Sequence, residues 1–279
     1  MKIAFLGTGR MGTELALHLL ADHEVVAWNR TAERTQRLVE AGARTTETAQ
    51  EAVDGAELVI TALFGPDAVR ETVIEPGLIG EGVPWLDTTT VSPADAEEFA
   101  SVVPTYIAAP VVGTLGPARA GKLGVYIGTP DEELRALGLR IAAPWADPER
   151  LRGVDSAAKA AAAKLLANLA LAVSAEGLRE ALDLGEACGI DPAETLDLLG
   201  STGLAFIAGM KGPFVRGERD TAGGDFTVDA IAKDARLMLA TSERDLPAVR
   251  AALGSLESQR EAGRGEHDFS AILRPDARG

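Results

Sequence analysis

Apolar residues follow two spacings along the first half of the chain. Short runs rich in strand-forming residues alternate with segments in which apolar residues recur at helical spacing. In the first such segment Met11, Leu15, Leu19 and Leu20 share one face. Strands alternating with helices predict a largely parallel sheet covered on both faces. The strands are expected at residues 2–6, 24–28, 57–63, 83–87, 105–109 and 123–128.

The pattern changes after about residue 152. From Ser156 to Cys188 the chain is rich in Ala and Leu and lacks Pro, which predicts one long helix. Further helices are expected at 192–200, 226–243 and 246–263, with loops rich in Gly, Arg and Asp between them. We therefore predict an α/β fold with a Rossmann dinucleotide-binding domain over residues 1–152 and an all-helical substrate and dimerisation domain over residues 153–279.

Composition and charge narrow the class of protein. With 46% hydrophobic and 25% charged residues, the 279-residue chain is ordinary for a globular protein. A net charge of -15 argues against a nucleic-acid-binding surface, because phosphate neutralisation needs clustered Lys and Arg. One cysteine and three scattered histidines offer no metal-ligand spacing, so no metal is expected. The expected partners are small-molecule substrates and copies of the same chain.

The location of the protein is also predicted from the pattern. The amino terminus runs straight into a strand pattern, without a basic stretch followed by an apolar core and a cleavage site. The apolar stretch at 160–177 carries Lys164, Asn168 and Glu176, which is unusual for a membrane span. We therefore expect a cytoplasmic protein that does not associate with membranes.

A glycine motif follows the first expected strand. Gly7, Gly9 and Gly12 fit the pattern G-x-G-x-x-G between a strand and a helix, with Arg10 and Met11 between the last two glycines. The first glycine permits a tight turn, the second a close approach of the backbone to a phosphate, and the third close packing of helix on strand. The amino end of the helix can then take a pyrophosphate. The alternative is a plain glycine turn, which would not require a strand before it and a helix and a strand after it.

The end of the second expected strand indicates which dinucleotide binds. An NAD-selective site usually carries Asp or Glu there, but this chain has Asn29, Arg30 and Thr31. Arg30 can pair with the 2′-phosphate of NADP, and Asn29 and Thr31 can donate hydrogen bonds to it. The predicted cofactor is NADP(H). The alternative is a turn with a solvated arginine.

These motifs together resemble the β-hydroxyacid dehydrogenase family, which contains 3-hydroxyisobutyrate dehydrogenases and glyoxylate or succinic semialdehyde reductases. The likeness covers nearly the whole chain and implies a fold like that of 6-phosphogluconate dehydrogenase. The stretch DTTTVSP at 87–93 is similar to the family's Asp-x-Ser-Thr-x-x-Pro loop, which implies that Thr90 contacts the cofactor. Leu63 is counted among the cofactor contacts as well. Ser92 before Pro93 also has the pattern of a helix cap, and both interpretations can hold.

A second stretch resembles the substrate loop of the family. Residues 108–123, AAPVVGTLGPARAGKL, match the usual Asp-Ala-Pro-Val-Ser-Gly-Gly with later Ala, Gly and Leu at similar spacing. Val112 stands in place of the serine that would bind a substrate carboxylate, and Thr114 replaces the second glycine. The backbone around Gly113 and the Thr114 hydroxyl can hold an anion instead, so we predict both as substrate contacts.

The third match is the family's Lys-x-x-Asn-Asn helix. Lys164 and Asn168 are four residues apart and project from one helical face. The resemblance gives Lys164 the role of general acid or base and Asn168 that of orienting the substrate. Ala167 replaces the first asparagine of the pair, and Ala158 and Ala160 replace an upstream Gly-x-Gly. Without the resemblance, Lys164 reads as a surface lysine whose stem lies along an amphipathic helix.

Two other lysines enter the prediction. Lys159 is a rival for the catalytic role, because the residues around it also echo those before the family's lysine. Five residues turn a helix by about 140°, so Lys159 and Lys164 cannot both face the cofactor. Lys233, followed by Asp234, resembles a Lys-Asp pair that reaches the nicotinamide end of the cofactor; such a pair is otherwise usually solvated.

The combined prediction is an NADP(H)-dependent oxidoreductase. It transfers a hydride between nicotinamide and a small carbonyl or hydroxy compound such as a β-hydroxy acid or an aldehyde acid. Two alternatives remain open at this point. One is an imine reductase, which the apolar Val112 favours and Lys164 disfavours. The other is a non-catalytic NADP-binding protein. By the resemblance, the chain forms a homodimer or homotetramer.

Overall fold

The computed structural model describes residues 1–273 and divides the chain into two compact units, Met1–Lys164 and Leu165–Gly279. The tail of the predicted second domain, residues 274–279, lies outside the described residues. The units divide inside the long helix α8 (Ala157–Ala187). The predicted boundary at residue 152 lies before this helix and stays a prediction.

All strands of the first unit join one nine-stranded sheet, in the order β3-β2-β1-β4-β5-β6-β8-β7 with β9 paired to β8. The pairs from β3 through β6 are parallel. β8 runs antiparallel to β6 and β7, and β9 runs parallel to β8. The order 3-2-1-4-5-6 is that of a Rossmann fold, so the predicted fold class is confirmed. The strands are Lys2–Leu6, Glu24–Trp28, Arg44–Thr45, Leu58–Thr61, Trp85–Asp87, Tyr106–Ala108, Val111–Val112, Leu123–Gly128 and Ala146–Val154, in chain order.

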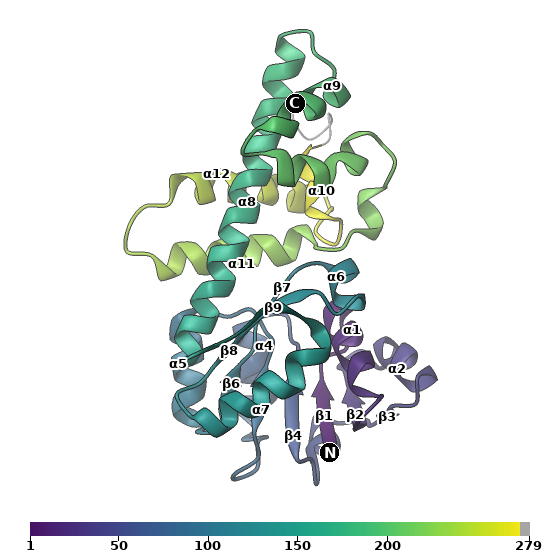
Figure 1. Cartoon of the computed structure of the whole chain (residues 1–279), viewed down its shortest axis with the longest axis vertical. Helices are drawn as coiled ribbons and strands as arrows, with labels where there is room; N and C mark the ends of the chain where they lie inside the picture. Colours follow the sequence, from purple (N-terminus) through teal and green to yellow (C-terminus); the bar gives the residue numbers. More distant parts are fainter. Residues whose placement is uncertain (274–279) are drawn as a thin grey trace. The chain divides into compact units, whose positions relative to one another are not determined.

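Helices cover both faces of this sheet (Figure 1). Side chains of β1 alternate between two cores: Ile3 and Phe5 pack with residues of α1 and α7, and Ala4 and Leu6 pack with residues of α5 and the start of α8. Both faces are apolar, as expected for buried parallel strands. The helices are α1 (Arg10–Leu19), α2 (Gln36–Glu40), α3 (Ala49–Val53), α4 (Pro66–Val69) with a π turn at Arg70–Ile74, α5 (Pro93–Val102), α6 (Leu115–Arg119) and α7 (Glu132–Ala142).

One long strand escaped the sequence prediction. β9 has the sequence ADPERLRGV, in which charged residues and Pro148 replace the expected apolar alternation. The strand lies at the edge of the sheet, against β8 alone. At an edge a proline costs no ladder hydrogen bond and charged side chains stay in water. The change of pattern near residue 152 therefore falls within a strand.

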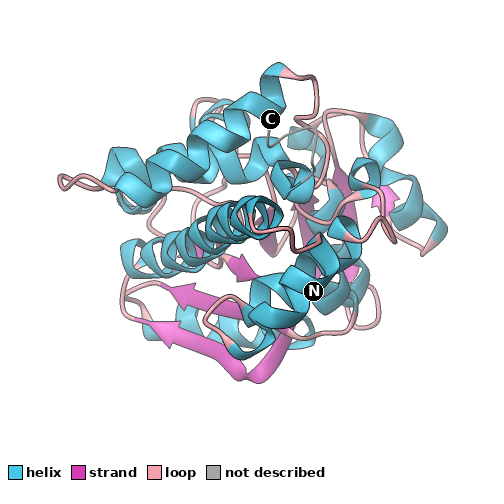
Figure 2. Ribbon diagram, turned by 90° about the horizontal axis from the view of Figure 1, so that it is seen from above, coloured by secondary structure: helices cyan, strands magenta, loops and turns pink. Residues whose placement is uncertain are grey.

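The described residues of the second unit form helices and short 3-10 turns, without a named strand, as Figure 2 shows by colour. α8, α9 (Pro192–Leu198), α11 (Val228–Thr241) and α12 (Pro247–Glu261) confirm the predicted helices. α10 (Ala205–Val215) was expected to be a loop, because it contains two glycines and Pro213. Tertiary packing overrides these low helix propensities, since Ile207, Ala208 and Phe214 are buried.

α8 is also the one helix among the described residues that is long and apolar enough, by length and composition, to cross a membrane. Of its most apolar stretch, 39% is buried inside the structure. The buried core helices of globular proteins meet the same two criteria, so the feature is weak support for a membrane span.

An ion pair lies in the interior of the second unit. Lys211 of α10 donates to Asp268 at 2.7 Å, and their side chains are 2% and 0% exposed. The Lys211 ammonium also lies 3.9 Å from the centre of the Phe269 ring. Asp268 accepts further hydrogen bonds from the backbone of Asp225, Phe226 and Ser270. Burial alone would raise the pKa of Asp268, but the charge and hydrogen bond of Lys211 bring it below its usual value.

We expect Lys211→Met to lower the free energy of unfolding of the second unit by about 3–5 kcal/mol, because Asp268 is left buried and unpaired. The lone carboxyl then has a raised pKa, so its penalty is present above that pKa and disappears as the pH falls through it. The loss measured by urea denaturation should thus be smaller at pH 5 than at pH 8. The double variant K211M/D268N is the control, with a smaller loss that does not vary with pH. Equal losses for the single variant at both pH values would contradict this account.

Candidate functional site

The carboxyl ends of the parallel strands set the place of the candidate site. From β1 the chain proceeds outward to β2 and β3 and then returns to β4 on the other side of β1. In an open α/β sheet, ligands bind outside the carboxyl ends of the strands at such a reversal. The loops that follow β1, β2, β4 and β5 meet at this edge and carry the predicted cofactor contacts of the first unit.

Each glycine of the opening motif has a distinct surrounding. Gly7 has φ +97°, and a Cβ atom there would lie 2.4 Å from the Ala62 carbonyl oxygen. A Cβ atom on Gly12 would lie 2.1 Å from the Gly7 carbonyl oxygen, so only glycine lets α1 approach β1 this closely. A Cβ atom on Gly9 meets nothing within 4 Å. Two glycines are therefore required by packing, whereas Gly9 faces open space at the start of α1.

The amino end of α1 suits an anion. Gly9 is its N-cap, no side chain caps the helix, and its first turn contains no acidic residue. The helix dipole and the backbone N–H groups of this turn favour negative charge, and Arg10 and Met11 stand in the same turn. The buried hydroxyl of Thr8, just before Gly9, makes no hydrogen bond within the described structure. These features fit the pyrophosphate of a dinucleotide.

The loop after β2 places its polar residues in two ways. The side chain of Asn29 accepts a hydrogen bond from the Thr8 backbone at 3.0 Å and donates one to the Thr31 carbonyl at 2.9 Å. Asn29 thus ties the glycine loop to the loop after β2. Arg30 and Thr31 are exposed, and so is Arg34, one helical turn further on, which the sequence analysis did not single out. The only feature of the sequence that points to Arg34 is its spacing of four residues from Arg30.

The loops after β4 and β5 meet over a buried carboxylate. Asp87 is 1% exposed and accepts hydrogen bonds from Thr61 at 2.6 Å, from the Thr89 backbone at 3.0 Å and from Tyr106 at 3.2 Å. Burial raises the pKa of Asp87, and these hydrogen bonds offset part of the rise. The Thr89 hydroxyl accepts from the backbone N–H of Leu63 at 3.0 Å. The loops that carry the predicted contacts Leu63 and Thr90 are thereby joined.

Ser92 behaves as its sequence context predicts. Its hydroxyl accepts from the Asp95 backbone N–H at the start of α5, and the Ser92 backbone N–H donates to the Asp95 carboxylate. The predicted helix cap is confirmed, and it fixes the direction in which the loop leaves β5.

The predicted substrate loop is anchored on the glycine-motif helix. Gly113 has φ +145°, and α6 follows it directly after Thr114. Arg119 at the end of α6 donates to the buried Glu14 of α1 at 3.1 Å, and His18 lies 2.8 Å from the Ala118 carbonyl oxygen. Burial would raise the pKa of Glu14, but hydrogen bonds from Arg37 and Arg119 lower it below its usual value.

The two rival lysines of α8 have different environments. Lys164 is only 9% exposed. The side chain of Lys159 is 64% exposed and pairs with Asp155 at 2.7 Å, four residues earlier. The start of the helix packs closely on β8, since a Cβ atom on Gly128 would lie 2.6 Å from the Ala160 Cβ atom. Lys159 is therefore a surface residue, whereas the Lys164 side chain is held below the surface.

In the second unit, Asp234 brings two predicted site residues together. The Asn168 amide donates to one carboxylate oxygen of Asp234 at 2.5 Å, and Lys233 donates to the other at 2.6 Å. Asn168 is 4% exposed and Asp234 2% exposed. The sequence pointed to Lys233 and Asn168 separately. Their link through Asp234 depends on the packing of α11 against α8 and has no sequence signal beyond the Lys-Asp pair.

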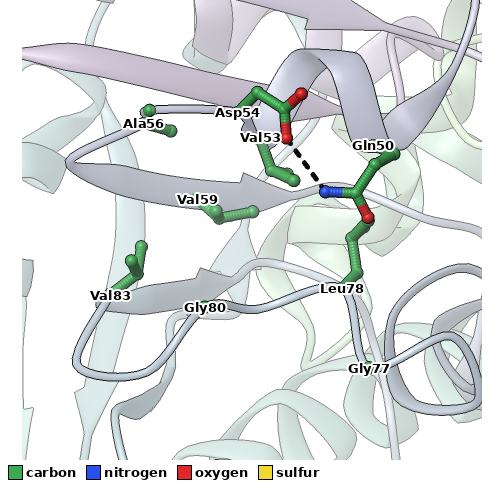
Figure 3. Close-up of a pocket in the computed structure, with 10 residues that line it drawn as sticks. Gln50, Val53, Asp54, Ala56, Val59, Gly77, Leu78, Gly80 and Val83 are labelled. Carbon is green, nitrogen blue, oxygen red and sulfur yellow. Dashed lines mark hydrogen bonds between the residues drawn. The ribbon is translucent and has the colours of Figure 1, made fainter.

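A hollow of about 310 Å³ lies elsewhere on the first unit, at the amino ends of β4 and β5 (Figure 3). Its wall is mostly apolar, and Gln50 donates a hydrogen bond to Asp54 at its rim. The hollow is at the edge of the sheet opposite to the glycine motif and contains none of the predicted site residues. Among residues 1–273 no cluster of three potential metal ligands is present.

Comparison with known proteins agrees with this arrangement. Residues 2–140 match the family model described as the NAD binding domain of 6-phosphogluconate dehydrogenase. Residues 158–275 match the model described as NAD-binding of NADP-dependent 3-hydroxyisobutyrate dehydrogenase. The 3-hydroxyisobutyrate dehydrogenase of Pseudomonas aeruginosa is 32% identical over 97% of this chain and 96% of its own length.

Solved structures have the same fold. The Mycobacterium tuberculosis 3-hydroxyisobutyrate dehydrogenase with L-serine superposes with a TM-score of 0.83, at 24% identity, over 98% of this chain and 97% of its own. An imine reductase from Pseudomonas sp. gives a TM-score of 0.61 at 20% identity, over 100% of this chain and 99% of its own. These two likenesses concern the fold alone.

The different roles of the glycines can be separated by substitution. We expect Gly9→Ala to leave the melting temperature unchanged, because its Cβ atom meets no neighbour, and to weaken dinucleotide binding by crowding the pyrophosphate. Gly12→Ala should lower the melting temperature, because α1 must move away from Gly7. Thermal denaturation and a fluorescence titration with NADPH measure both effects. A destabilised Gly9→Ala, or one that binds NADPH normally, would contradict this assignment.

Proposed function

The chain belongs to the β-hydroxyacid dehydrogenase family, and we propose that it transfers a hydride between NADP(H) and a small carbonyl or hydroxy compound, with Lys164 as the general acid or base. Family membership makes it an NAD(P)-dependent oxidoreductase. The predicted family, enzyme class and nicotinamide cofactor are thereby confirmed. The roles of individual residues and the choice of substrate are the proposal.

The observation that carries the proposal is the burial of Lys164 on α8. A lysine that is only 9% exposed is uncommon in a protein interior, and it lies one helical turn before Asn168, which is 4% exposed. The cofactor supplies the hydride chemistry when bound. During reduction, the Lys164 ammonium donates a proton to the oxygen that develops negative charge; during oxidation, the neutral amine removes it.

Asn168 orients the substrate in this proposal. Its amide is held by Asp234, which fixes the direction in which the side chain points. A substrate group that meets a preset amide loses less entropy on binding. Lys233 is tied to the same carboxylate and extends toward the cofactor in the family pattern. Asp234 thus supports two of the proposed contacts.

The substrate we propose is a small β-hydroxy acid or the corresponding aldehyde acid. Relatives of this chain are named for 3-hydroxyisobutyrate, 2-(hydroxymethyl)glutarate and glyoxylate or succinic semialdehyde, all of which carry a carboxylate. Val112 cannot bind a carboxylate, so the Gly113 backbone and the Thr114 hydroxyl take that role. Both follow β7 directly and are partly or fully open to solvent.

NADP(H) is proposed over NAD(H) because of the charge after β2. Arg30, Thr31 and Arg34 are exposed there, and none of residues 29–32 is acidic. A 2′-phosphate adds negative charge that a guanidinium binds in two parallel hydrogen bonds. Asn29 contributes by holding this loop against the glycine loop.

The domain boundaries, the oligomeric state and the cellular location of the protein are further parts of the proposal. We place a dinucleotide-binding domain at residues 1–152 and a substrate and dimerisation domain at 153–279. Exposed apolar side chains of the second unit support assembly into a homodimer or homotetramer, among them Leu166, Leu184, Leu198 and Phe206. We infer a cytoplasmic enzyme that binds neither membranes nor nucleic acid, in line with its net charge of -15.

Imine reduction is the second candidate function. The fold shared with the imine reductase and the apolar Val112 favour it, since an imine has no carboxylate to bind. Lys164 disfavours it, because imine reductases commonly carry Asp or Tyr at that position. The two functions differ in the substrates that oxidise NADPH.

Lys164→Ala should reduce turnover of aldehyde acids by about 100- to 10,000-fold, the contribution of a positioned general acid, while NADPH binding stays unchanged. Lys159→Ala is the matched control on the same helix and should retain full turnover. NADPH oxidation with a panel of aldehyde acids, neutral aldehydes and cyclic imines measures the effect. Normal turnover in Lys164→Ala would contradict the proposed role of Lys164 as the general acid or base. Activity on imines alone would favour imine reduction.

Arg30→Ala should raise the Kd of NADPH by about 10- to 100-fold, the worth of a charge-assisted hydrogen bond, and leave that of NADH unchanged. Arg44→Ala is the control, because Arg44 is also exposed but pairs with Glu24 on the neighbouring strand. Fluorescence titrations with both dinucleotides test the difference. An equal rise in the Kd of NADH would show that Arg30 does not bind the 2′-phosphate.

A further inference from the structure

The carboxyl ends of β4 and β5 are joined by a polar cluster that the proposed reaction does not use. Trp85 donates to the Thr61 hydroxyl at 2.9 Å, and this hydroxyl donates to Asp87 at 2.6 Å. The indole therefore fixes the direction in which the Thr61 hydrogen points. Tyr106 and Thr89 are the other donors to the carboxylate, Thr89 through its backbone N–H and its side chain.

The cluster reaches the backbone of the neighbouring loop. Thr89, whose N–H is held by Asp87, accepts from the Leu63 N–H through its hydroxyl at 3.0 Å. Ala62, just before Leu63, is the residue whose carbonyl crowds Gly7. Three loops at this edge of the sheet, after β1, β4 and β5, are thus in direct contact.

The packing of the sheet does not require a carboxylate at the end of β5, where Asp87 lies. Among the described residues, buried Asp87 accepts hydrogen bonds from hydroxyl and amide groups and from no cation, and a buried carboxylate without a countercharge is costly. An apolar residue at the end of β5 would avoid that cost. What the carboxylate provides is direction, because it holds the Thr89 backbone and leaves the Thr89 hydroxyl aimed at Leu63.

We propose that Asp87 and Thr89 are positioning residues, which fasten the loops after β4 and β5 into one rigid platform for the nicotinamide half of the cofactor. The inference rests on the proposed contacts of Leu63 and Thr90 with NADP(H). The two residues act through the loops, and their loss weakens cofactor binding because a loosened loop must be ordered again on binding.

The test compares NADPH affinity among variants of the full chain. Thr89→Ala removes the acceptor of the Leu63 N–H and should raise the Kd of NADPH about fivefold, as expected for one lost hydrogen bond. Thr89→Ser keeps the hydroxyl and should restore the affinity. Thr88→Ala is the matched control, because the adjacent Thr88 hydroxyl bonds the Thr61 carbonyl and does not contact Leu63.

Asp87 is tested with two further variants. Asp87→Ala should weaken NADPH binding like Thr89→Ala. Asp87→Asn should keep the affinity, since its amide oxygen still accepts from Thr61 and Thr89 and its amide nitrogen donates to Tyr106. If Asp87→Ala does not fold, Thr89→Ala and Thr89→Ser still decide the question. Without cofactor, faster amide hydrogen exchange at Leu63 in Thr89→Ala gives a second readout.

The outcomes separate this inference from the proposed function. Unchanged NADPH affinity in folded Thr89→Ala, or an equal loss in Thr88→Ala, overturns the platform while the proposed function stands. Failure of the unsubstituted chain to bind NADPH overturns the proposed function and the platform together. Weaker binding in Thr89→Ala with recovery in Thr89→Ser supports the inference.

Discussion

The close packing of α1 on β1 is the constraint on which the rest of the first unit depends. The Gly12 backbone lies where any side chain would collide with the Gly7 carbonyl, and Gly7 in turn leaves no room beside Ala62. This packing brings the amino end of α1 to the carboxyl edge of the sheet, where its dipole can meet an anion. It also places Ala62 and Leu63 beside the glycine turn, so the same glycines position the proposed pyrophosphate site and the proposed platform after β4.

Buried charges mark the places where the chain accepts a cost in stability. Glu14, Asp87, Asp234 and Asp268 are each almost fully buried, and each holds two or more segments that are distant in sequence. Asp87 and Asp234 lie next to proposed contacts. Glu14 and Asp268 do not: Glu14 ties α1 to α6 through Arg119, and Asp268 pairs with Lys211 in the second unit. A carboxylate with several preset donors orients its neighbours more strictly than an apolar contact can. Two of these carboxylates therefore orient proposed contacts, and the other two join elements of the fold.

Sequence patterns predicted the helices and strands that have a typical local sequence, and they failed where tertiary packing determines the secondary structure. The glycine motif, β1, β2, β8 and α8 could be predicted because each is an unbroken local run of residues typical of its structure. β9 and α10 are not, since an edge strand need not alternate and a buried helix can carry Gly209, Gly212 and Pro213. The sequence pointed to Lys164 and Asn168 as a pair on one helical face and to Lys233 separately. The bonds that link Asn168 to Lys233 and Thr89 to Leu63 join distant segments, and no local pattern encodes them.

One departure from the family pattern on α8, at Ala160, goes with a close contact between the helix and the sheet. Ala160 stands where the family has glycine, and it packs against Gly128 at the end of β8, so the glycine needed for this close approach lies on the strand. The contact anchors the first turn of α8 on the sheet and so fixes the direction of Lys164, four residues later. Lys159 turns away from that direction by more than a third of a circle and reaches Asp155 in solvent. The anchoring of α8 by Gly128 thus selects which lysine is held in the interior, and this is the lysine that we propose as the general acid or base.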